Sequence, residues 1–374
     1  MNNAPFRFAH SGLGQWMEAA EACLRGLQPV PVTANLGFVY VTDLYANRLP
    51  EILDYLRIHS GVGHWVGSVG IGVCATAQEY LDESAIAVML GEFPEDGFRV
   101  FGNVTELAQI GEQAGGFEVG DRTAHYALVH GDARNAEVPD LIEALAAQMQ
   151  SGFVTGGITS SRFQSQQVAD DVVHGGLSGV MFGAQVPVMT RLTQGVTPIA
   201  APHQVTASQE NILVALDGRP ALDVLNEDIG EILARDLSRA AGYIFAALTV
   251  SGSDTGDYLV RNLIGADTNE RLVAISDMVP AQGEVVFCRR DASAAREDML
   301  RMLGDIKQAL TAPPRGAVYY SCLGRGASLF GADSVELKLI SEVLGEFPLV
   351  GFFANGEISH DRLYGYTGVL TLFL

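Results

Sequence analysis

Apolar residues recur in the same order at three places along the chain. Each place begins with a short apolar strand, continues with an amphipathic helix and a glycine-rich apolar strand, and ends with another apolar strand. The expected first strands are 37–41, 126–129 and 317–320, with helices at 49–57, 139–149 and 334–344, glycine-rich strands at 65–70, 153–158 and 349–353, and closing strands at 85–90, 177–182 and 367–373. Because strands joined through a helix are usually parallel, these repeated strand-helix-strand-strand units predict an α/β fold of mixed sheets with packed helices.

Each unit has a glycine at the corresponding position of its glycine-rich strand. Gly67, Gly156 and Gly351 each follow apolar residues in the glycine-rich strand. We therefore expect the three units to superpose with these glycines at equivalent places.

The rest of the chain predicts an additional domain. An amphipathic helix is expected at 14–27, ahead of the first unit. Between the second and third units, the pattern predicts strands at 211–216, 271–275 and 285–288, a long helix running from Ile229 through Ile244, and another helix at 299–310. An acidic segment, 91–121, matches none of these patterns.

We place the domain division near Ala215. This gives a helical lead at 1–33, a first domain of two repeat units at 34–215, and a second domain at 216–374 that ends in the third unit, 315–374.

Composition excludes several classes of protein. The 374 residues, 48% of them apolar, suffice for about two domains of roughly 100–200 residues each. A net charge of −21 and the lack of a Lys/Arg run argue against nucleic-acid binding. No apolar run of about 18 residues suggests a membrane span, and the first residues do not resemble a secretory signal. We expect a cytoplasmic protein.

Metal and cofactor sites are not indicated either. Cys23, Cys74, Cys288 and Cys322 form no Cys-x-x-Cys pair, so neither zinc nor a disulfide framework is signalled. The eight histidines never recur at the i, i+4 spacing that places two ligands on one helix face. The glycines near residues 61–72 precede or interrupt a strand instead of opening a helix, which argues against a dinucleotide site.

The densest group of polar residues follows two strands of the third unit. Open α/β sheets bind ligands beyond the carboxyl ends of their strands, where these two loops should meet. There Arg325 could grip a carboxylate with two hydrogen bonds and Glu357 could take an ammonium group, which predicts a zwitterionic ligand. The predicted binding residues are Cys322, Gly324, Arg325, Asn355, Gly356, Glu357 and His360, with Ser160 and Arg162 at the corresponding strand end of the second unit.

Two other interpretations of these residues stay open. In the first, the glycines only satisfy turn geometry and Arg325 pairs with Glu357 for structural reasons. In the second, Cys322 is the nucleophile of a hydrolase or transferase, with Glu357 or His360 as its base, because a thiol near a guanidinium can have a lowered pKa. No general base is evident from the sequence, so we assign no catalytic residue.

Several separated stretches resemble the FIST (F-box and intracellular signal transduction) family. They are 351–358 (GFFANGEI), 366–373 (YTGVLTLF), 321–326 (SCLGRG), 195–199 (GVTPI) and 216–225 (LDGRPALDVL), and the resemblance extends over about 34–374. It implies a two-domain sensory module that binds small molecules such as amino acids, without a cofactor. A signalling partner or homo-oligomerisation would then carry the output.

Overall fold

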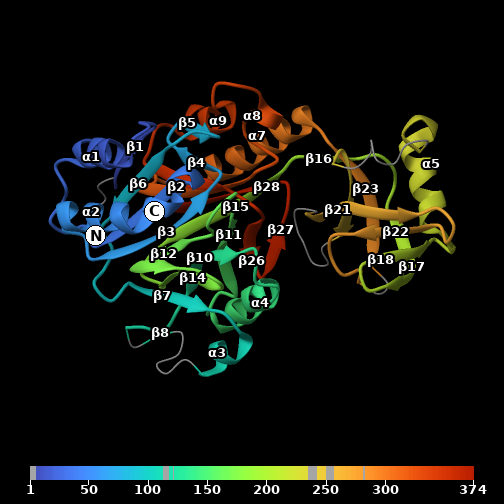
Figure 1. Ribbon diagram of the computed structural model, residues 1–374, viewed down its shortest axis with the longest axis horizontal. Coiled ribbons are helices and arrows are strands. Elements are labelled where there is room, and N and C mark those ends of the chain that lie inside the picture. Colours follow the sequence, from blue (N-terminus) through green and yellow to red (C-terminus); the bar gives the residue numbers. More distant parts are fainter. Residues whose placement is uncertain (1–5, 113–117, 121, 235–241, 250–256, 281–282) are drawn as a thin grey trace. The chain divides into compact units, whose positions relative to one another are not determined.

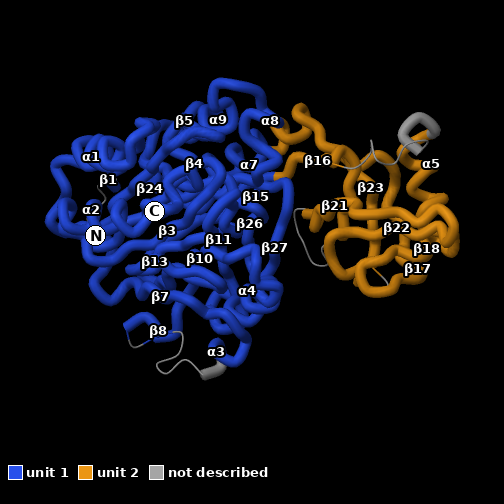
Figure 2. The backbone as a smooth tube through the Cα atoms, viewed as in Figure 1, with its two compact units in different colours: residues 1–193, 299–374 blue, residues 194–298 orange. Residues whose placement is uncertain are grey.

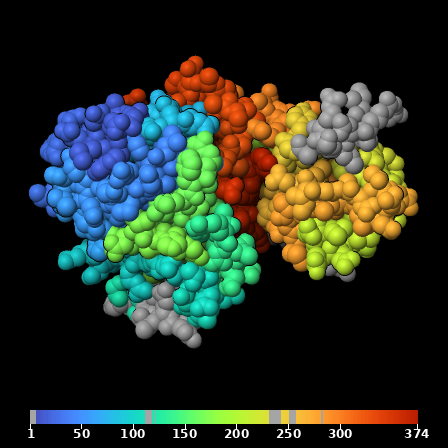
Figure 3. Space-filling model, viewed as in Figure 1, coloured from blue at the N-terminus to red at the C-terminus, as the bar shows by residue number. Residues whose placement is uncertain are grey.

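The computed structural model describes residues 6–112, 118–120, 122–234, 242–249, 257–280 and 283–374. Two compact units divide the chain, and Figure 2 shows them in different colours. Unit 1 comprises residues 1–193 and 299–374, and unit 2 comprises residues 194–298. The surface of unit 1 is therefore built from the beginning, the middle and the end of the chain, seen as blue, green and red in Figure 3.

Unit 1 contains three six-stranded sheets built on one plan. Each has a central strand with a parallel glycine-rich strand on one side and an antiparallel closing strand on the other (Figure 1). The central strands are β2 (Leu36–Thr42), β10 (Tyr126–Asp132) and β24 (Gly316–Cys322), the glycine-rich strands are β3 (His64–Gly70), β11 (Phe153–Thr159) and β25 (Leu349–Ala354), and the closing strands are β6 (Ile86–Gly91), β14 (Leu177–Phe182) and β28 (Thr367–Phe373). The predicted repeat is confirmed.

The three glycines occupy one register position. Gly67 lies opposite Val39, Gly156 opposite Val129, and Gly351 opposite Tyr319. A Cβ atom at these glycines would lie 1.7, 1.9 and 1.8 Å, respectively, from the carbonyl oxygen of that partner. Only glycine lets the two strands approach this closely, which explains why the residue recurs in every unit.

A hairpin follows each glycine-rich strand and joins the sheet of a different repeat. The hairpins are β4 (Gly72–Ala75) with β5 (Gln78–Leu81), β12 (Gln167–Ala169) with β13 (Asp171–Val173), and β26 (Glu357–His360) with β27 (Arg362–Tyr364). The first repeat's hairpin pairs with β25, the second repeat's with β3, and the third repeat's with β11. The exchange therefore forms a closed cycle of three, which the sequence pattern did not predict.

Each repeat also begins earlier than the sequence pattern indicated. An edge strand beside the closing strand opens it, and a helix follows: β1 (Arg7–Ser11) with α1 (Trp16–Leu27), β7 (Phe98–Val104) with α3 (Leu107–Glu112), and β15 (Val188–Gln194) with α7 (Ala292–Ala309). The predicted helical lead, 1–33, thus contains the start of the first repeat. The acidic segment, 91–121, contains the start of the second, together with β8 (Glu118–Val119).

The helices that link central and glycine-rich strands cover the outer faces of the sheets. They are α2 (Leu49–Ser60), preceded by the 3₁₀ helix η1 (Asp43–Arg48), α4 (Val138–Gln148), and α9 (Val335–Leu344), preceded by the short helix α8 (Ala327–Phe330). Between the sheets lies one apolar cluster to which all three repeats contribute. At its centre the Tyr40 hydroxyl lies 3.2 Å from His130 Nε2 and 2.9 Å from the Tyr320 hydroxyl.

Unit 2 is an insertion into the third repeat, between β15 and α7. Its strands form an antiparallel sheet that the pairing of β20 with β23 closes into a small barrel. The elements are β16 (Val196–Pro198), β17 (His203–Gln209), β18 (Ile212–Leu216), β19 (Arg219–Pro220), α5 (Ala221–Ala234), β20 (Ile244–Thr249), β21 (Tyr258–Asp267), β22 (Leu272–Ile275) and β23 (Glu284–Arg290). The predicted division at Ala215 lies in β18.

The long helix predicted through Ile244 was wrong. Helix α5 is described over Ala221–Ala234, and Ile244 is the first residue of β20, where it is buried in the barrel core. Residues 235–241, which the prediction also included, lie outside the described residues. An apolar residue at helical spacing was in this case a barrel residue, because strand and helix periods overlap over short runs.

Because the strands approach so closely at these glycines, adding a side chain there should lower the stability of the protein. Gly67→Ala should lower the free energy of unfolding by about 3 kcal/mol, because the Val39 carbonyl must move or its hydrogen bonding must be lost. Urea denaturation followed by circular dichroism would measure this. The matched control is Gly63→Ala, just before the same strand, where a Cβ meets nothing within 4 Å. Equal effects of the two variants would contradict the steric explanation.

Candidate functional site

The third repeat carries a buried group of charged residues at the end of its central strand. Arg325 lies in the turn after β24, where its backbone N–H donates to the Cys322 carbonyl over 2.8 Å. Its side chain is fully buried, and its Nε donates to Glu336 Oε1 over 2.7 Å. Glu336 is also fully buried, in the first turn of α9. The predicted arginine is therefore at the strand end, but its ion-pair partner is Glu336 and not Glu357.

Glu336 holds the cluster together. Its two carboxylate oxygens accept four hydrogen bonds: from the Tyr319 hydroxyl at 2.7 Å, the Ser321 hydroxyl at 3.0 Å, the Gly326 backbone N–H at 2.9 Å, and Arg325 Nε. Hydrogen bonds from this many donors replace the hydration that the carboxylate loses on burial. Its charge is thus compensated inside the cluster.

The outer end of Arg325 lacks such compensation. Both terminal nitrogens, Nη1 and Nη2, are buried, and no described residue accepts a hydrogen bond from either. The guanidinium carbon lies 5.0 Å from the ring centroid of Phe330, so an aromatic face partly covers the group. Two parallel N–H donors at the end of a fixed guanidinium have the geometry that binds a carboxylate bidentately.

Glu357 supplies an acceptor from a neighbouring strand. It is fully buried at the start of β26, and its Oε2 accepts hydrogen bonds from the Thr367 hydroxyl at 2.7 Å and backbone N–H at 3.2 Å. Its other oxygen, Oε1, has no hydrogen-bond partner among the described residues. Burial raises the pKa of Glu357 to about 8, although the positive charge of Arg325 opposes the shift.

A further carboxyl group, Glu79, borders the cluster. It comes from β5 of the first repeat, is almost fully buried, and leaves its Oε2 without a described partner. Burial and then the nearby Glu336 carboxylate raise the pKa of Glu79 to about 7. The hairpin exchange brings this residue to the third repeat, since β5 follows β4 beside β25.

The other two repeats show what this position needs for folding alone. Glu357 pairs with the residue that directly follows the shared glycine of the neighbouring glycine-rich strand. The hairpin residues with the same pairing in the other two sheets are Gln167 and Val73. Gln167 is fully hydrogen bonded, donating to the Gly176 carbonyl at 3.1 Å and accepting from Ser178 at 2.6 Å. The same fold therefore accommodates a neutral amide or an apolar side chain where the third repeat buries a carboxyl group.

The helix position of Glu336 shows the same contrast. It is the second residue of α9, and the second residues of α2 and α4 are Pro50 and Pro139. Proline suits the first turn of a helix, so the two other repeats follow the ordinary preference. Glu336 was not among the predicted residues, because it lies on a helix and not in a loop; the signal in the sequence is the departure from proline at the second helix position of the third repeat.

The remaining predicted residues of the third repeat lie around the cluster in different ways. A Cβ at Gly324 would lie 3.0 Å from the ring of Tyr366, so this ring covers the turn. Asn355 is exposed, and its backbone N–H donates to the Ile158 carbonyl at 2.9 Å. Gly356 adopts a φ of 141°, which favours glycine, and its carbonyl accepts from the Ile158 N–H at 2.8 Å. Asn355 and Gly356 thus join the third repeat to the second.

Cys322 and His360 do not form the arrangement that nucleophilic catalysis needs. Burial, followed by the Glu357 carboxyl, raises the pKa of the Cys322 thiol to about 12, which disfavours the thiolate. His360 is exposed three residues along β26 from Glu357, on the opposite face of the strand. Its ring packs edge-on against Phe153, with the centroids 4.1 Å apart.

The predicted pair in the second repeat has structural partners. Ser160 donates to the Phe353 carbonyl and accepts from the Ile71 N–H at 2.9 Å, which joins all three repeats. Arg162 makes a two-point ion pair with Asp43, with its closest contact at 2.8 Å, and another with Asp82 at 2.7 Å. Because these groups bind one another, the ligand-binding potential lies with Arg325 and Glu357.

No group of three or more His, Cys, Asp or Glu side chains among the described residues is arranged to hold a metal ion. None of the described helices is both long enough and apolar enough to cross a bilayer.

The raised pKa of Glu357 predicts a pH dependence of stability. The folded state keeps the Glu357 proton to about pH 8, whereas an ordinary glutamate loses it near 4.5, so stability from this group is lost as pH rises between these values. Glu357→Gln should therefore become more stable than the natural protein as pH rises from 5 to 8.5. Melting temperatures across this range would measure the difference.

The control for this prediction is Glu342→Gln, an exposed position on α9. Its melting temperature should follow that of the natural protein at every pH. A constant difference between Glu357→Gln and the natural protein from pH 5 to 8.5 would mean that Glu357 stays ionised beside Arg325.

Comparison with known proteins agrees with the architecture. The FIST N domain matches residues 35–219 and the FIST C domain matches residues 221–360. The uncharacterized protein Rv0628c of Mycobacterium tuberculosis is 32% identical over 361 residues, covering 91% of this chain and 92% of its own. The uncharacterized protein Mb0898c of Mycobacterium bovis is 28% identical over 357 residues, covering 91% and 89%. The chain therefore belongs to the FIST family of sensory domain proteins.

Proposed function

We propose that this protein senses a small zwitterionic metabolite, such as an amino acid, through Arg325 and Glu357. The observation that carries the proposal is the pair of buried Arg325 nitrogens without an acceptor, close enough to Glu357 for the two charges to influence each other. A ligand carboxylate would accept from the two nitrogens, and a ligand ammonium would donate to Glu357 Oε1, with Glu357 giving up the proton that it otherwise keeps to about pH 8. One molecule with both groups would satisfy every unpaired atom of the pair.

The energetic cost of the arrangement supports a ligand. A buried polar group without a hydrogen bond costs about 1–3 kcal/mol, and more when the group is charged. The second repeat avoids this cost with Gln167, and the first with Val73. Since folding does not demand the charges, their presence in the third repeat favours a role in binding.

The output of such a sensor would pass through a partner protein or a second copy of the chain. The residues of the candidate site lie on or next to strands that belong to two different sheets of unit 1. Glu357 lies on a hairpin that pairs with β11 of the second repeat, and Arg325 follows β24, which pairs with β25 and β28. A ligand that draws Arg325 and Glu357 together would therefore act on two sheets at once.

A cysteine-dependent hydrolase or transferase is the alternative. The raised pKa of Cys322 and the place of His360 argue against it. Cys322 instead lies beside the candidate site. The residue is half-buried, and both Glu357 and Arg325 influence the pKa of its thiol.

The proposal predicts selectivity for zwitterions. Isothermal titration calorimetry with the common L-amino acids should give at least one ligand, and its decarboxylated and deaminated analogues should each bind at least about tenfold more weakly, since each leaves one charge unpaired. Arg325→Lys should weaken the same ligand at least about tenfold, because an ammonium group cannot give two parallel hydrogen bonds.

The matched control is Arg134→Lys. Arg134 follows the central strand of the second repeat, is exposed, and pairs with Asp132 at 2.6 Å. Its substitution should leave the affinity unchanged within about twofold. The site would be refuted if no amino acid bound, or if the two lysine variants bound the ligand equally.

A cysteine variant separates the sensor from the enzyme. If Cys322 only borders the site, Cys322→Ser should change ligand affinity by less than about tenfold, or 1.4 kcal/mol. Binding would again be measured by calorimetry, and circular dichroism would check the fold. A turnover of the ligand that the natural protein shows and this variant lacks would favour the enzyme.

A further inference from the structure

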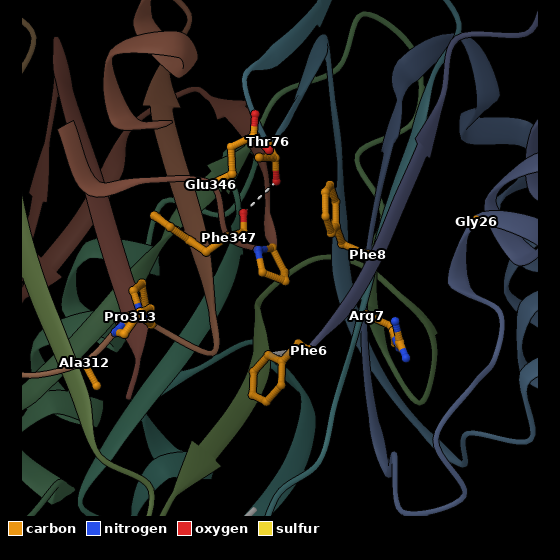
Figure 4. Close-up of a pocket in the computed structure, with 11 residues that line it drawn as sticks. Phe6, Arg7, Phe8, Gly26, Thr76, Ala312, Pro313, Glu346 and Phe347 are labelled. Carbon is orange, nitrogen blue, oxygen red and sulfur yellow. Dashed lines mark hydrogen bonds between the residues drawn. The ribbon is translucent and has the colours of Figure 1, made fainter. Parts of the chain in front are cut away.

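A pocket of about 600 Å³ lies at the opposite ends of β24 and β25 from Arg325. Its walls come from β1, from the loop before β24 and from the loop before β25. Three aromatic rings and three prolines supply most of the apolar lining: Phe6, Phe8, Phe347, Pro313, Pro314 and Pro348. Figure 4 shows Phe6, Phe8 and Phe347 among the residues that border the pocket. None of the binding residues predicted from the sequence lines this pocket.

Three polar backbone groups in these walls are already hydrogen bonded. The Phe6 N–H donates to the Arg315 carbonyl at 2.7 Å, the Pro348 carbonyl accepts from Ala317 at 2.8 Å, and the Phe347 carbonyl accepts from the Thr76 hydroxyl at 2.9 Å, the dashed line in Figure 4. Prolines have no N–H to offer. An occupant that is mostly apolar therefore leaves these three groups satisfied.

The walls are held apart by the fold. The prolines restrict the two loops, and the loop before β25 is fixed by Thr76, whose hydroxyl also accepts from the Leu349 N–H at 3.0 Å. On the other side Gly26 packs against β1 so closely that a Cβ there would lie 2.8 Å from the Ala9 Cβ. These contacts fix the backbone of the loop before β25 and of β1 on two sides of the pocket.

Two charged side chains mark the rim. Arg7 and Glu346 line the pocket and are exposed, and within the described residues neither forms a hydrogen bond or an ion pair through its side chain. A polar group at one end of a ligand could remain in water beside them. Charge at this rim is thus available, but the apolar walls determine the class of ligand.

We propose that this pocket binds a second small molecule: a predominantly apolar compound built on aromatic or alicyclic rings, with its one polar end at the rim. Small-molecule sites generally have volumes of about 300–1,000 Å³ and mostly apolar, aromatic walls with few polar groups. The pocket meets both criteria. The inference is independent of the Arg325 site, which binds charged groups at the other end of the same strands.

The test uses N-phenyl-1-naphthylamine, a neutral ring compound that fluoresces in apolar surroundings. We expect a saturable rise in fluorescence with one molecule bound per chain. Ala312→Trp places a large side chain on an exposed loop position of the lining, and Phe8→Ala removes one ring. Each should weaken the probe's affinity at least about tenfold.

The control variants are Ala201→Trp, an exposed alanine in unit 2, and Phe163→Ala, which removes a ring that is 65% exposed outside the pocket. Both should bind the probe like the natural protein. The inference is overturned if the probe shows no saturable binding, or if Ala312→Trp, with circular dichroism unchanged, binds it as tightly as Ala201→Trp. An amino-acid ligand that competes with the probe would also overturn it, because one site would then explain both.

Discussion

The three sheets of unit 1 depend on a single shared centre. Every repeat sends residues of its central strand into one apolar cluster, and no repeat could bury that face alone. Within this cluster Tyr40, His130 and Tyr320 occupy equivalent positions on the three central strands. The Tyr40 hydroxyl is hydrogen bonded to both of the other side chains. Burial lowers the pKa of His130 to about 3, so the imidazole is neutral and the centre carries no charge. The uncharged centre fixes the three strands to which all other elements attach.

Against this neutral centre, the charges of the third repeat stand out. The ends of β2 and β10 also carry arginine–carboxylate pairs, Arg162 with Asp43 and Arg134 with Asp132, but both arginines reach solvent. Arg325 alone among these three is fully buried, and its carboxylate comes from a helix position that is proline in the other repeats. The internal repeats thus serve as a control within one molecule: they show which features the fold requires and which the third repeat adds.

Much of this architecture could be predicted from the sequence, because long apolar strands separated by helices leave a clear period. The frame of nine strands and the equivalence of Gly67, Gly156 and Gly351 follow from that period alone. The hairpins could not be predicted in the same way. Strands of three or four residues carry little periodic signal, and their partners lie in another repeat. The helix expected through Ile244 failed because the barrel core uses the same apolar residues.

The candidate site was only partly predictable for a related reason. Loop composition singled out Arg325 and Glu357, and both side chains are fully buried near the ends of neighbouring strands. The ion pair that positions Arg325, however, comes from Glu336 on a helix, and Glu79 arrives from the first repeat through the exchanged hairpin. Such contacts depend on tertiary structure, and no local pattern announces them.

The closed cycle of exchanged hairpins has a consequence for ancestry. Three identical chains of one repeat each, every one lending its hairpin to the next, would satisfy the same pairings around a threefold axis. Such a homotrimer would have to place any buried arginine and glutamate three times over. Joining the copies in one gene removes that obligation, so one copy is free to acquire a costly set of charges while the other two keep the assembly stable.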